Sequence, residues 1–401
     1  MGQKELESFL KGFIEKESLF KNKKALQSAF MPETIVHREK EVKLLANILA
    51  PSLKTEKPSN LFIYGKPGTG KTLTTKYITK NIINIASQNN VPVNLLFLNC
   101  KLKKIADTEY RIVAQLARDL GKAIPTTGLP TEEVYKIFFE AIDSKSGIII
   151  IVLDEIDQLV KKAGDEILYN LTRINEDLKK SQICLIGISN DLVFLDNLDP
   201  RVKSSLSEEE ILFAPYNALQ LQDILRERCK VSFREDTLEE GLIEKCAAFA
   251  AREHGDARRC LELMRVAAEI AERKNEKNVK ISHLDEAEDK IERDRIFDTI
   301  MSLPKQSQAV LYAVMSFQNN DEYVFTGDVY SIYKNICAKT GLKPLTQRRL
   351  SDIIGELDMF GIINAKVISK GRYGRTKKIS VPMAEQIKEK IKKSLETAME
   401  I

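Results

Sequence analysis

Residues 65–72 read Gly65-Lys66-Pro67-Gly68-Thr69-Gly70-Lys71-Thr72 and match every specified position of the pattern G-x-x-x-x-G-K-[ST]. A short apolar run at 61–64 precedes this loop, and a helix-compatible stretch at 72–86 follows it. The glycines let backbone N–H groups close around phosphate oxygens, and the helix N-terminus adds partial positive charge. We expect Lys71 to reach the β- and γ-phosphates of a nucleotide and the Thr72 hydroxyl to bind Mg²⁺. The alternative is a chance glycine-rich turn, which the flanking strand and helix disfavour.

A second motif lies at the end of another apolar run. Residues 148–153 are all apolar and five of the six are β-branched, and the run ends in Asp154 and Glu155. Such a run suits a strand buried on both faces of a parallel sheet, and ligands of open α/β sheets lie at the carboxyl ends of their strands. We expect Asp154 to bind Mg²⁺ and Glu155 to polarise the attacking water. An acidic turn after a core strand is the alternative, and the complete phosphate loop upstream makes it the weaker one.

The composition indicates a globular protein of two or three domains. Hydrophobic residues make up 43% and charged residues 30% of the chain, and no apolar run approaches the ~20 residues that span a bilayer. The N-terminus lacks the apolar core of a signal peptide, so we expect a cytoplasmic, nucleoid-associated protein with no membrane partner. The six cysteines form no C-x-x-C pair and there are three histidines, which argues for a reducing compartment and against structural zinc.

Positive charge is concentrated near the C-terminus. The formal net charge of the chain is +4, but residues 341–380 hold nine basic and three acidic residues and so carry +6. A nucleic-acid site would therefore be a local patch in this segment. Its basic residues are Lys343, Arg348, Arg349, Lys366, Lys370, Arg372, Arg375, Lys377 and Lys378.

The order of expected elements divides the chain into three parts. The first part alternates helical stretches with strands, which predicts a mostly parallel sheet. We expect its strands at 61–64, 93–98, 148–153, 183–188 and 210–213. From about 218 to 293 the sequence pattern is helical, and we expect helices over this whole part. From 294 onward we expect four helices (294–301, 305–317, 327–340 and 346–360) and two strands (362–369 and 377–381) with a basic, glycine-rich tip, which is the plan of a winged helix.

These motifs together resemble the AAA+ ATPases. The segment Ile186-Gly187-Ile188-Ser189-Asn190 looks like that family's sensor 1, which implies that Asn190 contacts the γ-phosphate or orients the water. The segment 198–206 resembles the one that carries the arginine finger, which implies that Arg201 acts on a neighbour's nucleotide. Gly255-Asp256-Ala257-Arg258-Arg259 resembles sensor 2, which implies that Arg258 reaches the γ-phosphate of its own nucleotide and leaves Arg259 ambiguous.

The added winged helix narrows the resemblance to the archaeal origin-recognition/cell-division-cycle initiator family over nearly the whole chain. The implied fold is an AAA+ parallel sheet with an N-terminal helical segment (1–214), a helical lid (215–293) and a winged-helix DNA-binding domain (294–401). The resemblance implies nucleotide contacts through Gly68, Thr69, Gly70, Lys71, Thr72, Leu73, Tyr216, Arg228, His37 and Arg38. It implies DNA contacts through the recognition helix and the wing, at Thr346, Gln347, Arg348, Arg349, Arg372, Tyr373 and Arg375, and through the element at 108–130.

The resemblance also implies a function. We expect a slow ATPase that uses ATP or ADP with Mg²⁺ as a switch, binds double-stranded origin DNA and helps load the replicative helicase, together with other initiator protomers. One alternative is a continuously cycling AAA+ motor of the branch-migration or clamp-loader type. Another is a signalling ATPase whose winged helix is a packing module, which the +6 segment disfavours because packing does not need an arginine-rich wing.

Overall fold

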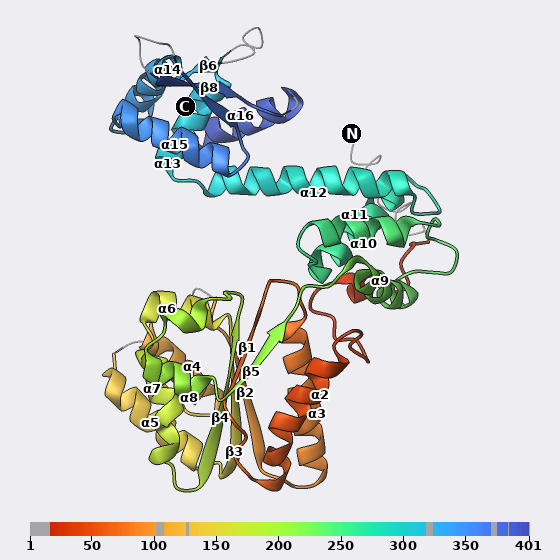
Figure 1. Ribbon diagram of the computed structural model, residues 1–401, viewed down its shortest axis with the longest axis vertical. Coiled ribbons are helices and arrows are strands. Elements are labelled where there is room, and N and C mark those ends of the chain that lie inside the picture. Colours follow the sequence, from red (N-terminus) through yellow and green to blue (C-terminus); the bar gives the residue numbers. More distant parts are fainter. Residues whose placement is uncertain are drawn as a thin grey trace, which may run out of the picture. The chain divides into compact units, whose positions relative to one another are not determined.

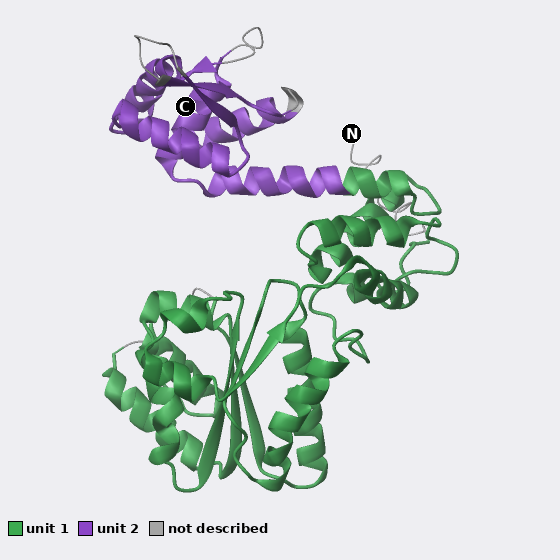
Figure 2. Cartoon of the chain, viewed as in Figure 1, with its two compact units in different colours: residues 1–287 green, residues 288–401 purple. Residues whose placement is uncertain are grey.

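Figure 1 shows the computed structural model, which describes residues 17–101, 108–125, 128–317, 324–369, 375–383 and 385–400. The chain divides into two compact units, residues 1–287 and 288–401 (Figure 2), and each is described by itself. Helix α12 (Ile281–Ser302) runs through this division. The expectation that one helix ends at 293 and another begins at 294 is wrong, because residues 281–302 contain no glycine or proline that would interrupt the backbone hydrogen bonds.

A five-stranded parallel sheet forms the base of the first unit, in the order β2-β3-β4-β1-β5. Each strand expected from the sequence is present, with bounds that differ by two residues at most. The strands are β1 (Leu61–Gly65), β2 (Val93–Asn99), β3 (Gly147–Asp154), β4 (Ser181–Ser189) and β5 (Glu209–Phe213).

Strand β3, which lies between β2 and β4, is buried on both faces because its alternate side chains enter two separate cores. Ile148, Ile150 and Val152 pack in a cluster with residues of α2 (Glu39–Leu49) and α3 (Lys71–Gln88). Ile149 and Ile151 pack in the other cluster, against helices on the opposite face (Figure 1). Those helices are α4 (Glu109–Asp119), α5 (Thr131–Asp143), α6 (Ile156–Ala163), α7 (Glu166–Arg173) and α8 (Pro200–Leu206). Helices on both faces thus hold the sheet in place, and with it the carboxyl edge from which Asp154 and Asn190 project.

A helical lid follows the sheet, and an N-terminal segment packs on it. The lid consists of α9 (Ala218–Ser232), α10 (Leu242–Arg252), α11 (Ala257–Arg273) and the start of α12. The rings of Phe20 and Phe233 stack with centroids 5.1 Å apart, and the backbone N–H groups of Lys21 and Asn22 both donate to the Ser232 carbonyl. The N-terminal segment therefore covers the lid before it continues into α2 of the sheet domain. Short 3-10 helices occur at η1 (Lys23–Leu26), η2 (Ala50–Lys54), η3 (Ile174–Glu176) and η4 (Phe194–Asn197).

The second unit is a winged helix with one strand and one helix beyond those expected. Its three-stranded antiparallel sheet has the order β6-β8-β7, and β6 has only two residues, too few to show a strand period in the sequence. Leu350, Ile353, Ile354 and Leu357 anchor α15 in the core of the unit. The elements are α13 (Lys305–Met315), β6 (Val324–Phe325), α14 (Thr326–Thr340), α15 (Gln347–Met359), β7 (Asn364–Ser369), β8 (Arg375–Ser380) and α16 (Glu385–Met399).

Two properties of the whole chain follow from these elements. Within the described residues, every helix is too short or too polar to cross a membrane. The six cysteines are buried and none forms a disulfide.

Candidate nucleotide site

The phosphate loop lies between β1 and α3, and Lys71 is the first residue of that helix. Its side chain is only 5% exposed. The ammonium donates to the carbonyls of Gly65 at 2.7 Å and Lys66 at 2.8 Å, and to Asn190 Oδ1 at 2.8 Å. Burial lowers the pKa of Lys71 to about 8, and the positive charge of Arg258 adds to this effect. Because burial disfavours the charged form of this amine, a ligand that brings several negative charges would stabilise that form.

The two expected magnesium ligands lie side by side at the carboxyl edge of the sheet. The Thr72 hydroxyl is 3.1 Å from both carboxylate oxygens of Asp154. Burial raises the pKa of Asp154, and the hydrogen bond from Thr72 opposes that rise. The Asn99 amide also donates to Asp154, at 3.4 Å, from the end of the neighbouring strand β2. Hydroxyl and carboxylate oxygens are the donors that Mg²⁺ prefers, so this pair fits the ion.

Glu155 follows Asp154 and occupies an unusual backbone conformation. Its φ is 57° and its ψ is 46°, the left-handed region that side chains other than glycine rarely adopt. This conformation ends β3 and starts α6, and its carboxylate lies 3.7 Å from the ammonium of the exposed Lys101. Strain of this kind is typical of functional residues held by the surrounding fold.

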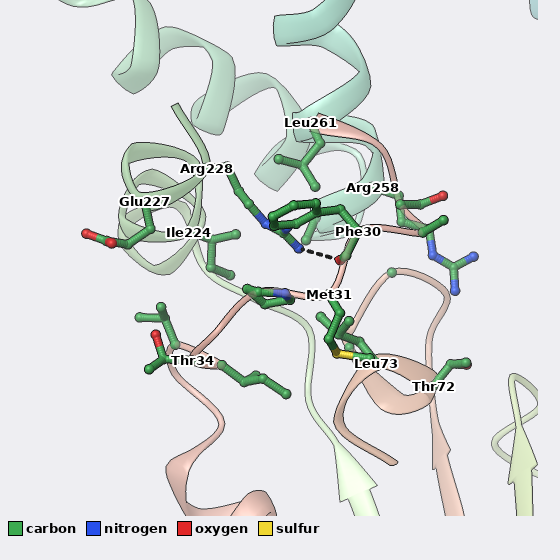
Figure 3. Close-up of a pocket in the computed structure, with 18 of the residues that line it drawn as sticks. Phe30, Met31, Thr34, Thr72, Leu73, Ile224, Glu227, Arg228, Arg258 and Leu261 are labelled. Carbon is green, nitrogen blue, oxygen red and sulfur yellow. Dashed lines mark hydrogen bonds between the residues drawn. The ribbon is translucent and has the colours of Figure 1, made fainter. Parts of the chain in front are cut away.

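A cavity of about 460 Å³ lies where the phosphate loop, the N-terminal segment and the lid meet (Figure 3). Gly68, Gly70, Thr72 and Leu73 line its loop side, whereas Lys71 and Thr69 are buried and are not among the lining residues. Most of the exposed wall is apolar, as suits a flat aromatic base. Further lining residues come from the N-terminal segment and the lid, and include Phe30, Met31, Thr34, Ile224, Arg258 and Leu261.

The lid brings two of its expected residues to the cavity. Arg258, in the first turn of α11, lines the cavity and is exposed. The neighbouring Arg259 instead forms an ion pair with Glu253 at 3.0 Å, which distinguishes two arginines that the sequence left ambiguous. Arg228 also lines the cavity, and its guanidinium lies 4.9 Å from the centroid of the Phe30 ring and donates to the Phe30 carbonyl at 3.3 Å. Burial lowers the pKa of Arg228.

Tyr216 lies between the last strand, β5, and the first lid helix, α9. It is buried and lines the cavity, and burial raises the pKa of its hydroxyl. The guanidinium of Arg38 stacks on its ring with Cζ 4.0 Å from the centroid.

The structure does not place His37 and Arg38 in the lining of the cavity. His37 Nε2 lies 2.9 Å from Asp223 of the lid. Arg38 is 4% exposed and donates to the carbonyls of Thr69 at 3.1 Å and Ala214 at 2.5 Å. The physical reason is that both side chains are engaged by these partners, and the wall of the cavity is formed by the preceding residues 28–36. Arg38 thus supports the loop from outside.

Arg201 lies away from this cavity, on α8. Its side chain is 68% exposed, and its guanidinium donates to both carboxylate oxygens of Asp199 at 3.1 Å and 3.0 Å. The guanidinium also lies over the Tyr169 ring with Cζ 5.2 Å from the centroid. Arg201 is not among the residues that line the nucleotide cavity of its own chain.

The expected DNA contacts of the recognition helix all lie at the start of α15. Thr346 caps the helix and accepts a hydrogen bond from the Arg349 N–H. Gln347, Arg348 and Arg349 are exposed, and Arg349 pairs with Glu356 at 3.2 Å. In the wing, Arg372 and Tyr373 lie outside the described residues, and of Arg375 only the backbone, in β8, is described.

Several residues of the site escaped the analysis of the sequence. Asn99 is opposite Asp154 in the β2–β3 register, so a polar residue at the end of a neighbouring strand was a usable indication. Asp157 lies on α6, about one turn after the end of β3 at Asp154. It is buried and accepts a hydrogen bond from the Ser189 hydroxyl at 3.3 Å. The family resemblance implied a nucleotide pocket closed by residues 32–38 and by the lid, and the cavity wall at 28–36 overlaps that segment, so only residues 28–31 of the wall escaped the sequence analysis.

Comparison with known proteins places this architecture in a family. Three family models match in order: "ATPase family associated with various cellular activities (AAA)" at 61–215, "Cdc6 AAA+ ATPase-type lid domain" at 222–289, and "CDC6, C terminal winged helix domain" at 298–390. The "ORC1-type DNA replication protein" of Thermococcus onnurineus is 51% identical over 379 residues, which cover 93% of this chain and 91% of that protein. This chain belongs to the ORC1-type DNA replication proteins.

Other members of this family are similar over the same length. The ORC1-type protein of Pyrococcus abyssi is 50% identical, over 94% of this chain and 90% of its own. A solved structure, "Structure of the Aeropyrum pernix ORC1 protein in complex with DNA", is 41% identical with a TM-score of 0.80, over 94% of this chain and 98% of that chain. This ORC1-type chain is thus an AAA+ ATPase with a lid and a winged helix, and it binds nucleotide.

Proposed function

We propose that this ORC1-type protein is an ATP-dependent replication initiator that binds duplex origin DNA and helps load the replicative helicase. The observation that carries the proposal is the cavity in which the phosphate loop and Arg258 of the lid meet, in a chain that matches ORC1-type replication proteins over more than nine tenths of its length. Such a cavity lets a bound nucleotide hold two parts of the unit together, and a nucleotide-dependent conformation is what a switch requires.

The residues of the cavity have separate tasks in this proposal. The loop N–H groups and Lys71 would bind the phosphates, and Tyr216 and Arg228 would contact the rest of the nucleotide. Thr72 and Asp154 would hold Mg²⁺, which supplies charge neutralisation at the β- and γ-phosphates. Glu155 would accept a proton from the attacking water while Asn190 orients it. With a pKa of about 8 in the protein without nucleotide, Lys71 is mostly cationic at neutral pH, which is the form that would bind phosphates.

Hydrolysis by a single chain would be slow. Arg201 is exposed and apart from the cavity of its own chain, so it is available to a nucleotide bound by a neighbouring protomer. A guanidinium supplied in this way stabilises the charge that develops at the γ-phosphate and accelerates hydrolysis strongly. The partners in this proposal are therefore origin DNA, further initiator protomers and the replicative helicase.

The recognition helix would supply the main DNA contact. Exposed Arg348 and Gln347 lie in the first turn of α15, the position from which recognition helices reach base edges. The wing would contact an adjacent groove through Arg372, Tyr373 and Arg375, and the element at 108–130 would form a second surface. The Aeropyrum pernix relative, 41% identical, was solved in complex with DNA, which supports a DNA-bound state of this chain as well.

The experiment that tests the proposal is footprinting on the origin regions of the source organism, with ATP, with ADP and without nucleotide. We expect discrete protected sites whose occupancy depends on the nucleotide, together with turnover well below one per second. Uniform weak protection combined with rapid, ring-dependent ATP turnover would instead indicate a motor. Absence of any protection would favour a signalling ATPase.

A further inference from the structure

The first turn of lid helix α11 lies directly on the phosphate loop. The Ala257 N–H donates to the Gly68 carbonyl at 3.2 Å. The Asp256 carboxylate lies against the α-carbon of Gly68, because a Cβ built there would be 1.7 Å from Asp256 Oδ1. Gly68 has a φ of +73°, so both its backbone and its surroundings exclude a side chain. The glycine at this position of the loop therefore provides contact with the lid as well as access for phosphate.

Two more glycines complete the contact. A Cβ on Gly255 would lie 2.3 Å from the Tyr216 carbonyl oxygen, and a Cβ on Gly70 would lie 2.8 Å from the Tyr216 hydroxyl. The backbone of the lid turn thus rests on Tyr216 while Tyr216 rests on the loop. Because closely packed groups cannot shift independently, the position of the α11 start is tied to the conformation of the loop.

Asp256 also organises the turn that carries Arg258. Asp256 is the N-cap residue of α11, and its Oδ1 accepts a hydrogen bond from the Arg258 N–H at 2.7 Å. The carboxylate oxygen that lies on Gly68 is therefore the one that fixes the backbone of Arg258. Arg258 is in turn part of the cavity wall (Figure 3).

Direct contact between Asp256 and the nucleotide is electrostatically unfavourable. A carboxylate repels phosphates, and the charge of Asp256 raises the pKa of Lys71 while that of Arg258 lowers it. An acidic residue so near an anion site needs another reason for its presence, and its two backbone contacts supply one.

We propose that Asp256 is a positioning residue that docks the α11 turn on Gly68 and so fixes Arg258 above the phosphate loop. Discrimination between ATP and ADP then depends on Asp256 although Asp256 does not touch the nucleotide. The inference rests on the proposed contact of Arg258 with the γ-phosphate.

The test measures dissociation constants of the full chain for a non-hydrolysable ATP analogue and for ADP. We expect Arg258→Ala to reduce the preference for the ATP analogue. Asp256→Ala should reduce that preference about fivefold, the size of one lost capping interaction, whereas Asp256→Asn should retain most of it because an amide oxygen also caps. The double variant should equal Arg258→Ala alone. Glu262→Ala, which removes an exposed carboxylate one turn after Arg258 on α11, is the matched control and should retain the preference.

Hydrogen exchange at the Ala257 amide reports the docking itself. Asp256→Ala should accelerate exchange there while the melting temperature of the chain changes little. The inference is overturned if Asp256→Ala weakens both nucleotides equally, if its effect adds to that of Arg258→Ala, or if exchange at Ala257 is unaltered. An unchanged preference in Arg258→Ala would instead refute the proposed role of Arg258, and the exchange measurement would still decide whether Asp256 docks the lid.

Discussion

The Lys71 ammonium donates a hydrogen bond to Asn190 Oδ1 at 2.8 Å and thereby joins the phosphate loop to the end of β4. Strands β1 and β4 are neighbours in the sheet, with Tyr64 opposite Ser189 in the register, so the residues that follow these strands meet at one edge. The contact places a polar amide beside the cation that would face the γ-phosphate. A nucleotide can therefore act on the loop and on the sensor strand at the same time.

Nucleotide affinity should depend on pH through Lys71. Its pKa near 8 in the free protein arises from burial first and from Arg258 second. Bound phosphates would raise that pKa, so binding above pH 8 takes up a proton. We expect a constant dissociation constant below about pH 7.5 and a weakening of up to tenfold per unit above pH 8. Calorimetry in buffers of different ionisation enthalpy would measure the proton uptake.

One variant and one control test whether Lys71 causes this pH dependence. Lys71→Ala should lose most nucleotide binding, while Lys76→Ala, an exposed lysine of the cavity wall, should keep the same pH profile. A flat affinity between pH 7 and pH 9.5 in the unaltered protein would contradict the assignment of the proton to Lys71.

Glu155→Gln should separate binding from hydrolysis. The change keeps the shape of the side chain and removes its ability to accept a proton, so the rate should fall on the order of 10²- to 10⁴-fold while the affinity for ATP stays the same. Phosphate release and equilibrium binding measure the two properties. Glu166→Gln, at an exposed carboxylate that starts α7, is the control. Unchanged hydrolysis in Glu155→Gln would refute the role of Glu155.

Arg38→Ala should destabilise the fold and weaken nucleotide binding indirectly. The Arg38 guanidinium is buried and joins the Thr69 carbonyl to the Ala214 carbonyl and to Glu41 at 2.8 Å. Removing one member of a buried, charged network costs about 3 kcal/mol, here in the free energy of unfolding. Denaturation with urea measures this cost.

The neighbouring His37 offers a matched comparison for that prediction. Its bond to Asp223 lies between side chains that are 28% and 46% exposed, and exposed ion pairs contribute little. His37→Asn keeps a residue that tolerates the φ of 61° found there, so we expect a change below about 1 kcal/mol. Equal destabilisation by the two variants would show that Arg38 has no special structural role.

The sequence predicted the elements that carry strong local patterns. The apolar run at 148–153 is β3, and residues at the ends of β1, β3 and β4 meet because parallel strands share one carboxyl edge. The loop at 65–72 needs glycine conformations that few other sequences provide, and Gly68 and Gly70 do adopt positive φ. Local chemistry was therefore sufficient for the sheet and for the loop.

Contacts between distant segments could not be predicted in the same way. The role of Arg38 depends on carbonyls 31 and 176 residues away, and these do not appear in any local pattern. The helix break expected between 293 and 294 does not occur, because residues 281–302 form the single helix α12. Arg258 and Arg259 look alike in the sequence, and only the ion pair with Glu253 separates them.

Arg201→Ala should abolish hydrolysis that depends on protein concentration and leave nucleotide affinity in a dilute sample unchanged. The reason is that Arg201 is exposed on α8 and absent from the lining of its own cavity. A mixture of Arg201→Ala with Glu155→Gln should recover activity, because the second protein supplies the arginine and the first supplies the intact site. Loss of affinity for ATP in dilute Arg201→Ala would show that the arginine acts within its own chain.

DNA binding should distinguish the two arginines at the start of α15. Arg349 is held by Glu356 at 3.2 Å, whereas Arg348 is exposed and no such ion pair is found for it among the described residues. We expect Arg348→Ala to cost about 1–3 kcal/mol on origin DNA and to relax specificity at one position, if it reads a base. If it binds a phosphate, affinity for all duplexes should fall and the salt slope of log K should change by about 0.9. Arg349→Ala, the matched control, should have the smaller effect. Titrations of origin and scrambled duplexes at several salt concentrations measure both, and equal affinity of the unaltered protein for the two duplexes at physiological salt would refute origin recognition by this helix.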